Sequence, residues 1–179
     1  MMLDAVDRRG PVGKRDYAIL LLLVTYGLRA REIAALTLDN IDWKRERLHV
    51  PDRKAGHSTV FPLSSVVGNA VVDYLKDGRP KTSHRALFIN AVAPYLPITW
   101  TTVSLRAKWY LRRAGIEVHL PGSHTLRHSC VQRLLDAHLS LKTIGDYIEH
   151  RSPDSTRVYT KIDIEALREM ALGNGEAIL

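Results

Sequence analysis

The sequence predicts an α+β domain that is mainly helical and carries one small antiparallel sheet. Three observations lead to this prediction. Residues 18–24 form an apolar run that is soon followed by Gly27, a residue type that commonly ends helices. Two β-prone segments, 48–50 and 59–61, flank a polar stretch, as the strands of a hairpin do. Several later segments repeat apolar residues at helical spacing between serine, glycine and proline boundaries.

The elements are expected in a definite order along the chain. Residues 16–26 are predicted to form a buried helix, and Arg29 to begin a short second helix. After the hairpin, residues 64–76 read as a helix, because a serine can cap its start and Gly78 can end it. A third strand is expected at residues 86–90. The later helices are expected at 100–114, from a Ser123 cap to about His138, at 140–149, at 153–160 and at 162–172.

Composition and charge limit the kind of protein. With 179 residues, 45% of them hydrophobic and 25% charged, residues 1–179 are expected to form a single soluble domain. The net charge is +7, and residues 1–161 hold 25 basic and 15 acidic residues. A basic body suits a polyanion, although charge alone does not separate nucleic acid from an anionic membrane. No apolar run approaches the roughly 20 residues of a membrane span. The single cysteine, Cys130, excludes an internal disulfide and favours the cytoplasm.

Six residues at fixed distances along the chain carry chemistry that fits together. They are Arg29, Lys54, His124, Arg127, His150 and Tyr159. Arginine binds phosphate oxygens bidentately and stays charged. Tyrosine becomes a nucleophile when a neighbour takes its proton, and a lysine can protonate a departing sugar oxygen. The set is therefore suited to the attack of a phenolic oxygen on a phosphodiester.

These residues stand in motifs that resemble those of the tyrosine recombinase (phage integrase) family. The first family motif, Thr-Gly-Leu-Arg-x-x-Glu-Leu, appears as residues 26–33, with Arg29 in the arginine position. The second, His-x-Leu-Arg-His, is intact at residues 124–128. The third, Leu-Gly-His with a tyrosine nine residues later, appears as residues 148–150 and Tyr159. The family lysine precedes a Pro-Leu pair, as Lys54 precedes residues 62–63. The resemblance covers essentially the whole chain.

The resemblance implies a site-specific DNA recombinase or integrase that uses a covalent 3′-phosphotyrosyl intermediate and needs no cofactor or metal. Tyr159 would attack the scissile phosphate, while Arg29 and Arg127 bind its non-bridging oxygens. His124 would act as general base and Lys54 as general acid. His150 would hydrogen-bond the phosphate. Glu32, three residues after Arg29, is placed to orient the Arg29 guanidinium rather than to act as an acid.

The expected partner is double-stranded DNA, together with further copies of the chain. The basic residues expected to contact DNA are Arg31, Lys44, Arg45, Arg106, Lys108, Arg112 and Arg113. Residues 162–172 carry an apolar helical face, and the resemblance implies that this helix docks on a neighbouring copy on DNA.

Other residues read as structural. Cys130 lies in an apolar helical pattern and is expected in the core. His124 and His128 have the i, i+4 spacing of zinc-binding helices, but Thr125 replaces the glutamate of that motif, so a metal site is not expected. His128 is expected to be buried and bonded to backbone. Five other tyrosines fall in apolar helical or loop patterns and are expected to be packing residues: Tyr26, Tyr74, Tyr95, Tyr110 and Tyr147.

Three departures from the family pattern keep alternatives open. Glu149 stands where the family prefers glycine, and a carboxylate there disfavours an anionic substrate. Tyr26 replaces a threonine and reads as harmless packing. The N-terminal DNA-binding domain common in the family is expected to be absent from this chain. A DNA-binding remnant without strand exchange, and a topoisomerase-like relaxing enzyme, therefore remain as alternatives.

Overall fold

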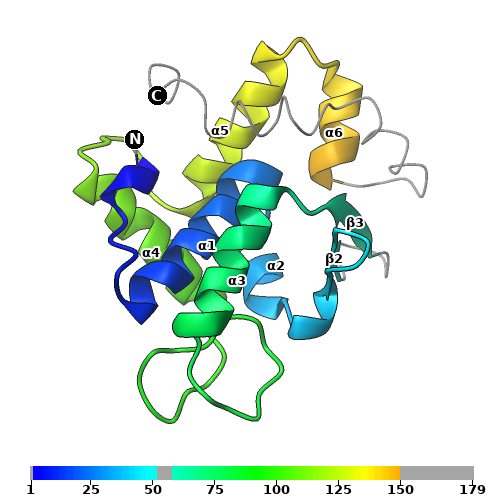
Figure 1. The fold of residues 1–179 in the computed structure, drawn as a ribbon. Coiled ribbons are helices and arrows are strands. Elements are labelled where there is room, and N and C mark those ends of the chain that lie inside the picture. Colours follow the sequence, from blue (N-terminus) through cyan, green and yellow to red (C-terminus); the bar gives the residue numbers. More distant parts are fainter. Residues whose placement is uncertain (1, 52–57, 150–179) are drawn as a thin grey trace.

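The computed structural model describes residues 2–51 and 58–149, which form a helical body with a small sheet at one side (Figure 1). The predicted helices at 153–160 and 162–172 lie outside the described residues, as do Lys54, His150 and Tyr159. The expected mainly helical α+β architecture is confirmed.

The described chain begins with a short 3-10 helix, η1 (Met2–Ala5), which the sequence analysis did not predict. The elements that follow are α1 (Pro11–Tyr26), α2 (Ala30–Ala35), the 3-10 helix η2 (Leu38–Asn40), β1 (Ile41–Asp42), β2 (Arg47–Val50), β3 (Thr59–Pro62), α3 (Ser65–Asp77), α4 (Trp100–Arg113), α5 (Ser123–Asp136) and α6 (Leu141–Glu149).

Helix α1 is the centre of the body. Its residues 18–23 are each at most 1% exposed, so this part of the helix is buried and apolar on every side. Helices α3 and α5 pack against it, while α4 contacts α2, α5 and η1 and α6 packs on α5 (Figure 1). Cys130 of α5 is 2% exposed and belongs to this core, as predicted. Because α1 contacts most of the other described helices, its buried position fixes where the residues that precede and follow it reach the surface.

The sheet has the order β1-β2-β3 with antiparallel pairing throughout. Leu48 pairs with Phe61, and both are at most 1% exposed, whereas His49 and Val60 on the opposite face are half-buried. This alternation is what a sheet with one buried face requires. The two predicted hairpin strands are therefore confirmed, and β1 is an additional short strand that the sequence analysis missed.

The predicted third strand at residues 86–90 is wrong. The segment makes only isolated bridges, one of them between Thr37 and Ala86. Its backbone amides donate to unrelated partners: Leu87 to the carbonyl of Leu36 at 2.8 Å, and Ile89 to the hydroxyl of Tyr74 at 3.1 Å. A β-prone composition thus produced an extended connection rather than a ladder, because its amides bond to separate neighbours at the end of α2 and on α3.

Two helix starts also differ from the prediction. Helix α1 begins at Pro11, five residues earlier than expected, with Gly10 as its N-cap. Proline is well tolerated there because the first-turn amides of a helix have no intrahelical acceptor. Ser123 is the first residue of α5 and not its cap, which is Gly122. The Ser123 hydroxyl instead lies 3.0 Å from that of Ser104 on α4.

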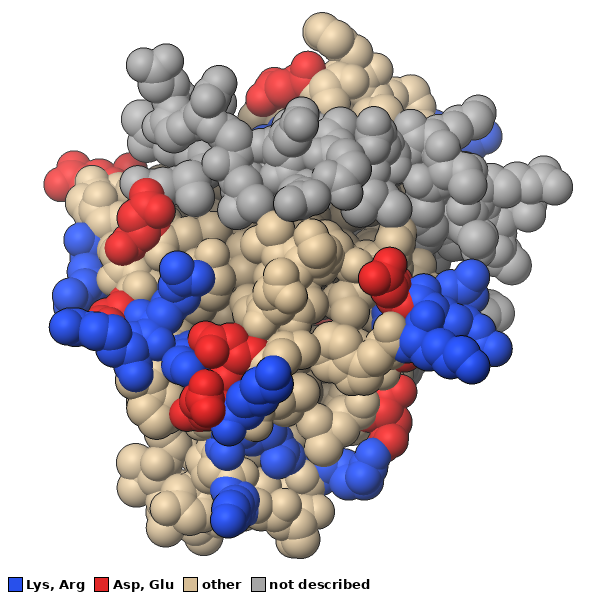
Figure 2. All heavy atoms as spheres, viewed as in Figure 1, with Lys and Arg blue, Asp and Glu red and all other residues tan. Residues whose placement is uncertain are grey.

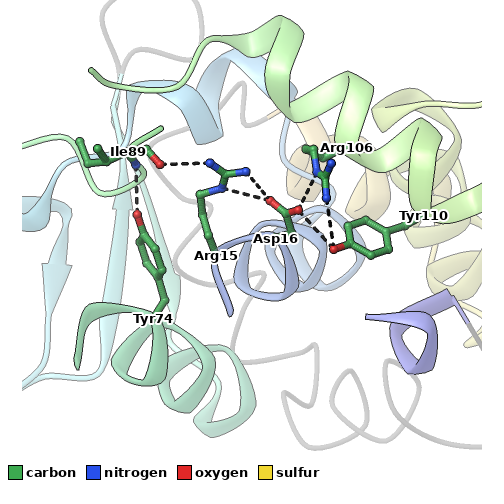
Figure 3. Close-up of polar contacts among 6 residues, drawn as sticks. All are labelled: Arg15, Asp16, Tyr74, Ile89, Arg106 and Tyr110. Atoms are coloured by element: carbon green, nitrogen blue, oxygen red, sulfur yellow. Dashed lines mark hydrogen bonds and ion pairs between the residues drawn. The ribbon is translucent and has the colours of Figure 1, made fainter. Parts of the chain in front are cut away.

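A buried charge cluster joins α1, α4 and the α3–α4 connection (Figure 3). The carboxylate of Asp16 is fully buried and accepts from Arg15 Nε and Nη2 at 3.0 and 2.8 Å. Its other oxygen accepts from Arg106 Nε at 2.6 Å and from the Tyr110 hydroxyl at 3.2 Å. Arg15 also donates to the carbonyl of Ile89 at 3.2 Å. One carboxylate therefore binds two arginines, Arg15 and Arg106, that lie 91 residues apart in the sequence.

Replacing Asp16 should destabilise the fold strongly. Asp16→Asn keeps the size of the side chain but removes the anion, so Arg15 and Arg106 lose their shared counter-charge. Breaking one partner of a buried ion pair costs about 3–5 kcal/mol. Urea denaturation should show this loss in the free energy of unfolding.

The matched control is Asp39→Asn, whose carboxylate pairs with Arg85 on the surface, both side chains being more than 60% exposed. Exposed pairs contribute little, so the unfolding midpoint of this variant should not move. Equal midpoints for the two variants would contradict the assignment of the Asp16 cluster as a main tertiary tie.

Candidate active site

A pocket of about 370 Å³ lies where the α1–α2 turn, α4 and the start of α5 meet. Its lining residues are Leu28, Arg29, Ala30, Arg31, Trp100, Ser104, Ser123, His124 and Arg127. The sequence motifs predict that Arg29, His124 and Arg127 contact one phosphate. The described structure brings these three to one pocket although they lie almost 100 residues apart.

Arg29 is positioned by the turn between α1 and α2. Gly27 ends α1 in the left-handed region, with φ of 59° and ψ of 32°, and Arg29 is the extended N-cap of α2. The Glu32 carboxylate accepts from the Arg29 backbone amide at 2.7 Å and from its Nη1 at 3.0 Å. The Glu32 side chain is 6% exposed and that of Arg29 is 40% exposed. Glu32 thus holds the guanidinium from the protein side, while Arg29 stays open to solvent.

Arg127 and His124 enter the pocket from the first two turns of α5. Arg127 Nη1 donates to the carbonyl of Gly27, in the turn that precedes Arg29. His124 is exposed. The N-cap Gly122 supplies no side-chain hydrogen bond to the first-turn amides of α5. The positive end of this helix therefore lies beside His124 and adds to the cationic character of the pocket.

Two further groups in the pocket were missed by the sequence analysis. Trp100, the first residue of α4, is half-exposed, and the Arg31 guanidinium lies 5.4 Å from its ring centroid. Ser104 and Ser123 share a hydroxyl–hydroxyl hydrogen bond across the α4–α5 contact. No local motif marks these residues, because they meet the arginines only through the packing of α4 on α2 and α5.

The other basic residues expected on DNA lie in several places. Lys44 and Arg45 are exposed after β1, where Arg45 Nη1 pairs with Asp42 at 3.2 Å. Arg112 and Arg113 are exposed at the end of α4, and Lys108 is half-buried. On the face drawn in Figure 2, basic side chains gather toward two sides of the body with acidic side chains among them. The described surface on this face therefore presents separate basic groups rather than one continuous patch.

Arg106 and His128 differ from expectation. Arg106 was expected on the basic face of α4, but its Nε is bound to the buried carboxylate of Asp16. The spacing of basic residues on a helix does not reveal that one of them is committed to a distant carboxylate. His128 was expected to be buried and is exposed. It follows Arg127 on α5 and turns away from the face that Leu126 and Cys130 bury.

Within residues 2–51 and 58–149, no group of three or more His, Cys, Asp and Glu side chains is placed to hold a metal ion. No helix in that same part of the chain has the length and apolarity needed to span a bilayer.

Comparison with known proteins assigns the family. The profile of the phage integrase family matches residues 1–165. The provisionally named integrase/recombinase y4gC of Sinorhizobium fredii is 39% identical over 173 residues, which make up 96% of this chain and 89% of that protein. Tyrosine recombinase XerD of Vibrio vulnificus is 31% identical over 173 residues, covering 94% of this chain and 56% of XerD. The chain belongs to the phage integrase family.

A solved structure supports the fold. The XerH site-specific recombinase bound to its difH substrate, in a pre-cleavage complex, superposes with a TM-score of 0.72 and 19% identity. The match covers 89% of this chain and 47% of the XerH chain. The chain therefore spans most of y4gC but about half of XerD and XerH.

Glu32 should contribute to stability as well as to the orientation of Arg29. Glu32→Gln keeps an oxygen for the Arg29 amide but loses the charged bond to its guanidinium, so unfolding should cost about 1–2 kcal/mol less. Urea denaturation measures the change, with the exposed Glu117→Gln as control. A loss no larger than that of the control would show that the capping contact carries no net stability.

Proposed function

We propose that this chain is the catalytic domain of a site-specific DNA recombinase that breaks and rejoins DNA through a covalent 3′-phosphotyrosyl intermediate. The observation that carries the proposal is the convergence of Arg29, His124 and Arg127 on one pocket. Membership of the phage integrase family and the names of its recombinase relatives support it. Nothing comparable favours a DNA-binding remnant or a relaxing topoisomerase.

The proposed reaction is an in-line displacement at phosphorus. The phenolic oxygen of Tyr159 forms the new bond to phosphorus as its proton passes to His124. The bond to the 5′ oxygen breaks, and Lys54 supplies the proton that this oxygen needs. Arg29 and Arg127 bind the non-bridging oxygens, where negative charge increases in the transition state, and His150 adds a hydrogen bond. A 5′ hydroxyl of another strand later reverses the displacement and releases Tyr159.

The proposed substrate is double-stranded DNA in the cytoplasm. Arg31 lies at the pocket beside the two phosphate-binding arginines, so it is placed for a neighbouring phosphate. Lys44, Arg45, Lys108, Arg112 and Arg113 are proposed as further backbone contacts. The XerH recombinase, which shares this fold, is bound to its difH substrate in the solved complex, and this supports DNA as the partner. Arg106 is proposed to act through Asp16 rather than as a free phosphate contact, because its Nε is bound to that carboxylate.

Tyr159→Phe should abolish the covalent adduct on a nicked suicide DNA, while DNA affinity stays within a few-fold. The change removes one hydroxyl, which is the nucleophile, and little volume. Denaturing gels and peptide mapping detect the adduct. Tyr95→Phe is the matched control, because Tyr95 is partly exposed and lies outside the pocket, and it should form the adduct normally. An adduct that persists in Tyr159→Phe would overturn the proposal.

The role of Lys54 can be tested by replacing the leaving atom. Lys54→Ala should cleave an ordinary substrate slowly, but a substrate with sulfur at the 5′ bridging position should restore the rate, because a thiolate leaves without a proton. Arg29→Ala should not be rescued by the same substrate, since its loss affects the non-bridging oxygens. Single-turnover cleavage measures both. Failure of the rescue would assign proton donation to another group.

We also propose that the apolar face of residues 162–172 links copies of the chain on DNA. Deletion of residues 162–179 should then abolish strand exchange and leave single-site cleavage in place. A thermal melt accompanies the assay. Loss of the cooperative melt, or exchange at the normal rate, would contradict a linking role.

A further inference from the structure

The last turn of α1 is held by side chains from α5. The final carbonyls of a helix lack intrahelical partners and carry its negative dipole end. Arg133 Nη2 donates to the carbonyl of Val24, and Arg127 Nη1 donates to that of Gly27. Two guanidinium groups of one helix thus bind the end of another, one on each side of the point where α1 stops at Tyr26.

A second pair of side chains holds the carbonyl of Thr25, between those two contacts. The Tyr147 hydroxyl of α6 donates to it at 3.2 Å, and Cys130 Sγ of α5 lies 3.6 Å from it. Tyr147 is 1% exposed and Cys130 is 2% exposed. The end of α1 is therefore joined to both α5 and α6 by directional bonds and not by apolar packing alone.

Arg133 occupies an unusual environment for a cation. Burial lowers the pKa of its guanidinium, and its Nε donates to the carbonyl of Ser129 at 3.2 Å. A partly buried charge is expensive to keep unless dipoles or anions face it. The C-terminal carbonyls of α1 supply such dipoles. The arrangement fixes Arg133 against α1 in one orientation.

We propose that Arg133 and Tyr147 are positioning residues for DNA cleavage, acting on Arg127 through the last turn of α1. The inference rests on the proposed function. By holding the carbonyls of Val24 and Thr25, the two side chains fix the Gly27 carbonyl that orients the Arg127 guanidinium. Arg29, the next residue but one, is held separately by the Glu32 carboxylate at 3.0 Å, so the effect falls on Arg127.

The expected consequence is a loss of rate without a loss of binding. A misplacement of about 1 Å at a catalytic group costs on the order of a hundredfold in rate. Tyr147→Phe removes one hydroxyl and keeps the buried ring, and Arg133→Met removes the donors while keeping an unbranched chain. Both variants of the full chain should cleave roughly ten- to a hundredfold more slowly in single turnover, with DNA affinity within about twofold of the unaltered chain because the surface cations remain.

The matched control is Tyr74→Phe. Tyr74 is also fully buried, and its hydroxyl accepts from the Ile89 amide, near the Asp16 cluster and away from the end of α1 (Figure 3). This variant also loses one hydrogen bond between a buried tyrosine hydroxyl and the backbone, although here the hydroxyl is the acceptor, so it reports the effect of stability alone. It should lower the unfolding midpoint and leave the cleavage rate unchanged. A Tyr147→Phe rate equal to that of Tyr74→Phe would overturn the proposal.

A double-mutant cycle separates positioning from a merely structural role. If Arg133 and Tyr147 act through Arg127, neither substitution should slow cleavage further in an Arg127→Ala background, measured as adduct accumulated over hours. Additive losses would overturn the proposal, since destabilisation slows any background equally. If Arg133→Met does not fold, the cycle is measured with Tyr147→Phe and Arg127→Ala only. If Arg127→Ala by itself cleaves normally, the proposed function fails, an outcome distinct from additivity.

Discussion

The left-handed turn at Gly27 is the constraint on which the candidate site depends. Helix α1 is buried on every side up to its end, yet Arg29 must reach solvent three residues later. A residue at φ of 59° reverses the chain at once, and glycine adopts that conformation without the steric strain that a side chain would add. Leu28, fully buried, then anchors the turn in the core. The same turn presents the Gly27 carbonyl to Arg127, so one backbone conformation serves both arginines.

Sequence patterns predicted the elements best where local chemistry decides the structure. The apolar run of α1 and its glycine stop, a serine cap for α3 and the two hairpin strands were all recognised from neighbouring residues, and the structure identifies the cap as Ser64. Predictions failed where a distant partner decides. Residues 86–90 are β-prone, but their amides bond to α3 and to the turn after α2. The Ser123 hydroxyl had a partner on α4 that no local pattern could reveal.

Only part of the site could be predicted, again because distant partners leave no local pattern in the sequence. Motif spacing identified Arg29, His124 and Arg127, which the described structure gathers in one pocket. Sequence patterns correctly predicted that Tyr26 and Tyr147 are buried, whereas Tyr95, which was also expected to pack, is exposed in the α3–α4 connection. Periodicity reports burial and not the direction of a polar tip. The Tyr26 hydroxyl donates to the Pro62 carbonyl and accepts from the Ser64 amide, both at 2.9 Å. It thereby ties the end of α1 to the end of β3, a contact beyond the harmless packing that sequence alone suggested.

The way the arginines are held bears on how the pocket would distinguish the ground state of a phosphodiester from its transition state in the proposed reaction. A guanidinium has five N–H donors, and the contacts to Glu32 and to the Gly27 carbonyl engage Arg29 and Arg127 through Nη1. At Arg29, further donors can therefore serve a ligand without breaking the contact to Glu32. Catalysis requires stronger binding of the transition state than of the ground state.

As a phosphodiester becomes pentacoordinate in the proposed reaction, its charge rises, and each nearby cation contributes roughly 4 kcal/mol per unit charge at 4 Å in a medium of effective dielectric constant about 20. Cations that must first reorient lose part of that gain, whereas fixed ones keep it. The Glu32 carboxylate offsets one positive charge, but Arg29, Arg31 and Arg127 together leave the pocket cationic. In the proposed reaction, orientation of the arginines, more than their number, is thus what the contacts of α5 and α6 with the end of α1 would secure.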